Sequence, residues 1–167
     1  MRRILIIAGL LLTAAQTAQA FQNEPTGFRG IQWGTPLSSV PGMSSAPDGS
    51  PGFYTRADDT MTIGGAHLKD ISYKFYHDQF SGIVLRTPEN SAADEEAIIA
   101  AFTAQFGQGY KDNQFLKRYL WRGSVSTVYL DCNSFTHACT GALLSNQLLK
   151  LEEADKAAVA RKGAKDF

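Results

Sequence analysis

Apolar and polar residues alternate strictly from residue 71 to residue 76, which is the period expected of a half-buried β-strand. Shorter β-favouring runs lie on either side and are separated by glycine and polar turn residues, so they predict a meander of antiparallel strands. A second strand-rich block follows residue 114. The expected strands cover residues 28–33, 53–56, 61–63, 71–76, 80–86, 115–121, 125–132 and 137–144.

The clearest helical pattern lies between residues 90 and 107. Asn90 or Ser91 can cap the N-terminus, the acidic residues 94–96 suit the first turns, and Gly107 supplies the stop. We interpret Glu95 and its acidic neighbours as helix-start charges. The apolar residues recur at helical spacing, so this stripe should pack on the sheet. They are Ile98, Ile99, Phe102 and Phe106.

Two further helices are expected. Residues 147–162 are rich in Leu, Ala, Glu and Lys and predict a C-terminal helix capped by Ser145 or Asn146, with residues 161–167 as a frayed tail. A short helix should open with Thr35 as N-cap and Pro36 at its first position.

The order of these elements predicts an α+β fold. Hairpin-linked strands with about three helices indicate an antiparallel sheet with the helices mainly on one face. Residues 43–52, "MSSAPDGSPG", show no periodicity and are expected to form a surface loop.

The N-terminus predicts export. Arg2 and Arg3 precede a short apolar run, which ends in small residues at 18–20, the order of a cleavable secretory signal peptide. The apolar run has about nine residues, whereas a spanning helix needs about twenty. We therefore expect residues 1–20 to be removed, leaving residues 21–167 as one periplasmic domain without a membrane anchor.

Charge and motifs exclude several functions. The chain has 16 basic and 16 acidic residues, and loss of Arg2 and Arg3 leaves 14 against 16, a net charge of −2. The remaining basic residues are scattered, which does not suggest nucleic-acid binding. There is no phosphate-binding glycine loop, dinucleotide fingerprint or calcium loop, so we expect no cofactor.

The only two cysteines lie in "LDCNSFTHACTG". If residues 125–132 and 139–144 form a hairpin centred between Phe135 and Thr136, Cys132 faces Cys139 as a non-hydrogen-bonded pair with Cα atoms about 4.5 Å apart. An exported protein with two cysteines favours a structural disulfide. A redox pair remains an alternative, as does a metal site at Cys132, His137 and Cys139, although the spacing matches no zinc motif. The face expected to turn to the core contains Val128, Leu130, Cys132, Cys139 and Leu143.

Histidines supply one catalytic alternative. A small periplasmic hydrolase could use His77 with Asp78, or His67, together with a serine such as Ser81. No serine lies in a Gly-x-Ser-x-Gly nucleophile pattern, and adjacent turn residues rarely point together.

Aromatic residues supply a second functional hypothesis. Strand alternation places Tyr76 and Tyr129 on the side opposite the core set, where they could line a surface that binds a peptide, a glycan or an envelope protein. The sequence therefore favours a non-enzymatic interaction module over an enzyme. Ordinary core packing with isolated surface tyrosines remains the simpler explanation of the aromatics.

Three segments carry a family resemblance: "FRGIQWGTPLSSVPGM", "IGGAHLKDISYKFYHDQFSGIVL" and "FGQGYKDNQFLKRYLWRG". They share a Gly-Ile-x-Trp-Gly-Thr start, a Tyr-x-Phe-Tyr strand and a Phe-Gly-x-Gly-Tyr helix end. In these features, residues 28–123 resemble a group of small exported bacterial proteins with no assigned activity. The resemblance implies a periplasmic location and no catalytic residues.

Overall fold

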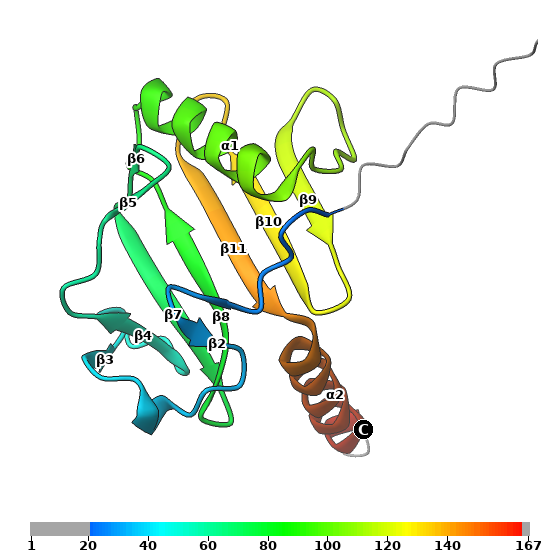
Figure 1. Ribbon diagram of the computed structural model, residues 1–167. Helices are drawn as coiled ribbons and strands as arrows, with labels where there is room; N and C mark the ends of the chain where they lie inside the picture. The colour runs from blue at the N-terminus through cyan, green and yellow to red at the C-terminus, as the bar shows by residue number, and fades with distance from the viewer. Residues whose placement is uncertain (1–20, 165–167) are drawn as a thin grey trace, which may run out of the picture.

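A seven-stranded antiparallel sheet dominates the fold (Figure 1). The computed structural model describes residues 21–164, so the expected signal peptide and residues 165–167 of the expected tail lie outside the described residues. Two small hairpins accompany the sheet, β1 (Gly27–Phe28) with β2 (Ile31–Gln32) and β5 (Thr62–Ile63) with β6 (Ala66–His67). The strands of the main sheet are, in spatial order, β3 (Met43–Ser45), β4 (Phe53–Arg56), β7 (Asp70–Tyr76), β8 (Gln79–Arg86), β11 (Cys139–Ser145), β10 (Ser126–Cys132) and β9 (Lys117–Arg122).

The α+β class with an antiparallel sheet is confirmed, but the number of helices is not. The described residues form two α-helices, α1 (Ala92–Phe106) and α2 (Asn146–Gly163). The expected helix after Thr35 is only a 3-10 turn, η1 (Leu37–Ser39), preceded by Pro36 in an extended conformation. Pro41 follows closely, and the residue before a proline is disfavoured in the α conformation, so no α-helical turn can propagate.

The capping signals of both α-helices are confirmed. The hydroxyl of Ser91 accepts a hydrogen bond from the backbone N–H of Asp94, and Gly107 ends α1 with a positive φ of 80°. Ser145 caps α2 by accepting from the N–H of Leu148. α2 remains helical through Gly163, and fraying of residues 161–167 stays a prediction.

The two helices contact opposite faces of the sheet, which corrects the expectation that helices pack mainly on one face. α1 crosses one face, which we call the core face (Figure 1). Lys74 and Tyr76 alternate with the buried Tyr73 and point to the other face. There they bond to Glu152 and Asp155 of α2. α2 thus covers the β7 end of the second face, which we call the open face.

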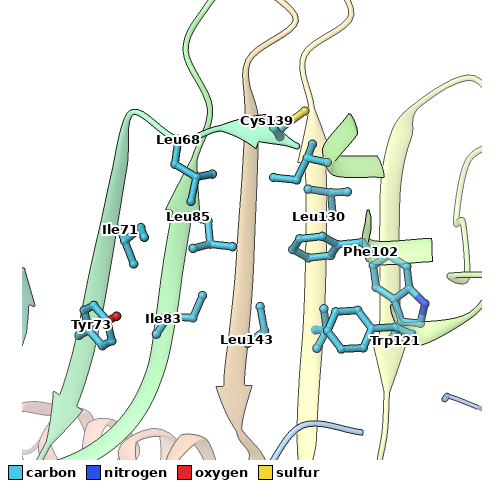
Figure 2. Packing of buried hydrophobic residues seen from close by; sticks show 14 of the residues in the cluster. Leu68, Ile71, Tyr73, Ile83, Leu85, Phe102, Trp121, Leu130, Cys139 and Leu143 are labelled. Carbon is cyan, nitrogen blue, oxygen red and sulfur yellow. The ribbon is translucent and has the colours of Figure 1, made fainter. Parts of the chain in front are cut away.

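The core lies between the sheet and α1. Alternate residues of β7, β8, β11, β10 and β9 share the core face, where Phe102 of α1 packs beside Trp121 (Figure 2). Phe102 lies so close to β11 that a Cβ on Gly141 would be 2.9 Å from its ring. The cluster is formed mainly of fully buried side chains, which supply most of the stabilisation. It includes Ile71, Tyr73, Ile83, Leu85, Ile98, Val128, Leu130 and Leu143.

The first described residues form a strap across the same core face (Figure 1). The ring of Phe21 meets that of Phe106 edge to face, and the N–H of Gln22 donates to the carbonyl of Phe106 at 3.0 Å. Further along, the Glu24 carboxylate accepts from the N–H groups of Val125 and Ser126 at 2.5 and 2.7 Å. The strap therefore ties the C-terminus of α1 to the turn between β9 and β10.

Residues 43–52 are not wholly a loop, because Met43–Ser45 forms the edge strand β3. Its pairing with β4 uses backbone groups, so the polar Ser44 and Ser45 give no alternating signal. A short edge strand with polar side chains is a common way to end a sheet. No helix within residues 21–164 is long and apolar enough to cross a membrane.

Candidate binding groove on the open face

The cysteine hairpin has the predicted register. Cys132 lies opposite Cys139, and the two are joined by a disulfide with Cα atoms 4.0 Å apart. The N–H of Asn133 donates to the carbonyl of Ala138 at 2.9 Å, which makes the neighbouring pair the hydrogen-bonded one, as expected. Both cysteines are buried on the core face.

The loop closed by this disulfide displays Phe135 to solvent. The Asn133 side chain accepts hydrogen bonds from the N–H groups of Phe135 and Thr136, and the backbone N–H of Asn90 donates to the Thr136 carbonyl at 2.6 Å. Phe135 nevertheless has 93% of its surface exposed. A large apolar side chain is therefore held in water by a well-constrained backbone.

A buried ion cluster supports the same loop from α1. The Glu95 side chain is only 2% exposed, and its two oxygens lie 2.7 Å from Lys117 Nζ and 2.6 Å from His137 Nδ1. Burial alone would raise the pKa of Glu95, but Lys117 and His137 outweigh it, so the pKa lies below its ordinary value. Glu95 lies in the first turn of α1 as predicted, and it also joins α1 to β9 and to the disulfide loop.

A second phenylalanine is presented by the same local device. The Asn113 side chain accepts from the N–H of Phe115 at 2.9 Å, and Phe115 is 81% exposed. Leu116, also exposed, follows it directly before β9. The predicted strand 115–121 includes Phe115, but β9 begins only at Lys117. Asn-x-Phe thus occurs twice, at 113–115 and 133–135.

Between these loops the open face is hollowed into a groove. A cavity of about 610 Å³ is lined by side chains of β9 and β10, including Arg118, Tyr129 and Asp131, and by Leu116 and Phe135. A second cavity of about 200 Å³ continues from Arg118 and Tyr129, which line both. We call the two together the open-face groove. The further lining residues used below are Leu120, Arg122, Tyr110 and Asp112.

The floor of the groove is a hydrogen-bonded group of three side chains. Asp131 Oδ2 accepts from the Tyr129 hydroxyl at 2.8 Å and from Arg118 Nε at 3.4 Å. The charge of Asp131 raises the pKa of Arg118, while burial, followed by the hydrogen bond to Asp131, raises the pKa of Tyr129. Near neutral pH the floor is therefore a fixed arrangement of one cation, one anion and one neutral phenol.

Tyr76 lies on the open face but outside the groove. Its hydroxyl donates to Asp155 Oδ2 of α2 at 2.7 Å, and its ring stacks on His77 with centroids 4.4 Å apart. The hydrogen bond to Asp155 raises the pKa of Tyr76 to about 12. Of the two tyrosines proposed from the sequence, Tyr129 lines the groove and Tyr76 helps to dock α2.

The residues of the hydrolase hypothesis are not brought together. His67 precedes β7 and contacts Asp94 of α1 at 3.0 Å through Nδ1. His77 and Asp78 form the turn after β7, where His77 Nε2 lies 3.5 Å from Asp155. The seven residues of β7 separate the two sites by about 20 Å.

The three residues of the proposed metal site are bonded to other protein groups. Cys132 and Cys139 form the disulfide, so neither offers a thiolate while the bond is intact. His137 is bonded to Glu95. Within residues 21–164, no group of three or more His, Cys, Asp and Glu side chains could hold a metal ion.

Comparison of the chain with protein-family models, curated proteins and solved structures finds no match. Sequence reasoning did not single out Phe135, the most exposed lining residue, or Phe115, which adjoins the lining residue Leu116. The repeated Asn-x-Phe was the available signal, since an asparagine that bonds the backbone two residues on marks a turn and leaves the phenylalanine at its tip.

Proposed function

We propose that this protein is an exported, non-enzymatic interaction module of the bacterial cell envelope, which binds its partner in the open-face groove. The observation that carries the proposal is Phe135, 93% exposed on a loop fixed by a disulfide and by hydrogen bonds. Phe115, which adjoins the lining residue Leu116, is presented by the same asparagine hydrogen bond. Export itself is an expectation from the N-terminal sequence.

Pre-organisation is the physical reason that such a residue suits binding. A partner that covers the Phe135 ring gains the burial of a large apolar surface, at roughly 25 cal/mol per Å². The partner does not have to offset the entropy of ordering the loop, because Asn133 and the disulfide already hold its backbone. Aromatic anchors of this kind dominate the energetics of many interfaces.

The groove floor favours binding over proton transfer. General acid or base catalysis works best with a group whose pKa lies near the working pH. The pKa values of Arg118 and Tyr129 are instead raised from values that already lie far above neutrality. These two side chains therefore keep their protons, and they orient a ligand by hydrogen bonding.

Site-specific photo-crosslinking in the cell envelope tests the proposal. A benzophenone amino acid replaces Phe135 in one variant and Val159 of α2 in a matched control. Val159 is also apolar and 70% exposed, but it lies on α2, away from the groove. We expect a discrete crosslinked species from position 135 that is missing from position 159.

The crosslinked partner is then purified and its binding measured directly. We expect wild-type protein to bind it, and Phe135→Ser to bind at least tenfold more weakly. Equal crosslinking from both positions, or equal affinity of wild type and Phe135→Ser, would reject the groove as the binding site.

A further inference from the structure

We infer that the open-face groove accepts an extended peptide of about five residues, with a carboxylate at the Arg122 end and an apolar side chain at the Phe135 end. This inference rests on the proposed function and specifies the chemistry of its partner. Shape, charge and the distribution of apolar side chains each support it.

The shape of the groove matches an extended chain. It follows β9 from Arg122 to Arg118 and continues to the disulfide loop that carries Phe135. The five residues of β9 from Arg118 to Arg122 span about 14 Å, which is also the span of five peptide residues in an extended conformation. Side chains on this face of a strand recur every second residue, the same repeat as in an extended peptide.

The two arginines in the groove differ in whether a carboxylate of the protein lies near the guanidinium. Arg118 lies 3.4 Å from Asp131 and 4.0 Å from Asp112. Arg122 is exposed, and in the part of the chain that the structure describes no carboxylate lies within 4.0 Å of it. Its guanidinium is thus free to bind a ligand carboxylate through two parallel N–H donors.

The opposite end of the groove is apolar. Phe135 and Leu116 line it from two different loops, and Phe115 adjoins Leu116. These side chains can enclose one apolar residue of a ligand. Burial of the apolar surface of that residue is their main contribution to affinity. Charge at one end and apolar surface at the other define the direction of the bound ligand.

The centre of the groove suits a peptide backbone. Asp131 uses Oδ2 for Tyr129 and Arg118, which leaves Oδ1 to accept from a ligand N–H. Arg118 has further guanidinium N–H groups to donate to a ligand carbonyl. A glycan would stack on an open aromatic ring at the floor, whereas the floor ring, Tyr129, is partly buried and its hydroxyl is bonded to Asp131. The most exposed rings, Phe115 and Phe135, lie on the flanking loops.

Three synthetic peptides test this inference by NMR titration of the isotope-labelled mature chain. The first is acetyl-Leu-Val-Thr-Ser-Val with a free C-terminal carboxylate, and the second is its C-terminal amide. The third is the amide with glutamate as its last residue. We expect the free acid to shift the resonances of Arg122, Tyr129 and Phe135, and the amide to bind at least tenfold more weakly. Binding of the glutamate peptide would show that a side-chain carboxylate suffices, and its failure would show that a chain terminus is required.

Matched variants locate the carboxylate. Arg122→Gln should abolish the preference for the free acid, while Arg161→Gln, an exposed arginine in the last turn of α2, should leave it unchanged. Equal binding of acid and amide to wild type would overturn the inference, as would shifts confined to other surfaces. So would a chitin-type tetrasaccharide that shifts the groove resonances when the peptides do not. If the peptide inference fails in one of these ways but Phe135→Ser still lowers the affinity for the crosslinked partner, the proposed interaction module stands and only the class of its ligand is wrong.

Discussion

Opening the Cys132–Cys139 disulfide should weaken the protein without unfolding it. The bond closes a loop of only eight residues, counted from Cys132 to Cys139. For a loop of this size, the chain-entropy model gives about 2.5 kcal/mol of stabilisation. The seven residue pairs between β10 and β11 remain after reduction, and β8 and β9 still flank the hairpin. The register should therefore persist.

Urea denaturation of the oxidised and the reduced wild-type protein measures this effect with no change in composition. We expect the free energy of unfolding to fall by about 2.5 kcal/mol, with an unchanged denaturant slope. The melting temperature should fall by about 8 °C for a domain of this size. Amide exchange should increase at Phe135 and Thr136, because one of the constraints on their loop is removed.

Two results would refute this reasoning. A loss well below 1 kcal/mol would mean that the reduced, unfolded chain already keeps the two cysteines close together, so that the crosslink removes little entropy from it. Unfolding on reduction at 25 °C would mean that the disulfide supports the whole sheet. The variant Cys132→Ala with Cys139→Ala should behave like the reduced protein, apart from a small additional loss for the buried sulfur atoms.

Three further substitutions test other contacts by equilibrium unfolding. Glu95→Gln should cost about 2 kcal/mol at pH 7, because it removes charged hydrogen bonds. Because the pKa of Glu95 is lowered in the folded protein, this stabilisation is fully present above the ordinary glutamate pKa of about 4.3. The difference from wild type should shrink as the pH falls below that value and vanish only below the lowered pKa of the folded protein. A loss that does not change with pH would contradict the ion-pair explanation. Gly64→Ala should lower the free energy of unfolding by about 3 kcal/mol, because Gly64 has a φ of +56° and the new Cβ would lie 2.1 Å from the Cβ of Ala101. Gly65→Ala should lower it by only about 1 kcal/mol, because Gly65 has a φ of +89° but open space around the new Cβ. Equal losses would show that backbone strain alone matters. Glu24→Ala should cost about 1–2 kcal/mol by freeing two N–H groups, and Glu24→Gln, which keeps an acceptor, should recover most of it.

Local patterns predicted the elements whose side chains alternate or whose ends carry caps. The alternation in β7, the register of Cys132 against Cys139, and the caps Ser91 and Ser145 all depend on residues close in sequence. Such features follow from backbone geometry and from local hydrogen bonding, which a single sequence exposes.

The features that were missed depend on contacts distant in sequence. β3 is held by backbone pairing, which its polar side chains do not show. α2 lies on the open face because Glu152 and Asp155 meet Lys74 and Tyr76, pairs separated by more than seventy residues. No periodicity within either segment encodes such a pairing.

The candidate site was only partly accessible to sequence reasoning. Alternation correctly placed Tyr129 on the face opposite the core. It could not reveal that α2 engages Tyr76, or that Glu95 would be buried between Lys117 and His137. For the exposure of Phe135 the turn signal Asn-x-Phe was the one indication, because an aromatic residue in a short loop is otherwise as compatible with burial as with exposure.

The affinity of Phe135→Ser for the partner captured at position 135 tests the central claim most directly. The measurement is a binding isotherm for wild type, Phe135→Ser and the control Val159→Ser, after all three have been shown to have the same melting temperature. We predict at least a tenfold loss for Phe135→Ser and none for Val159→Ser. Unchanged affinity of Phe135→Ser would contradict the assignment of the open-face groove as the binding site.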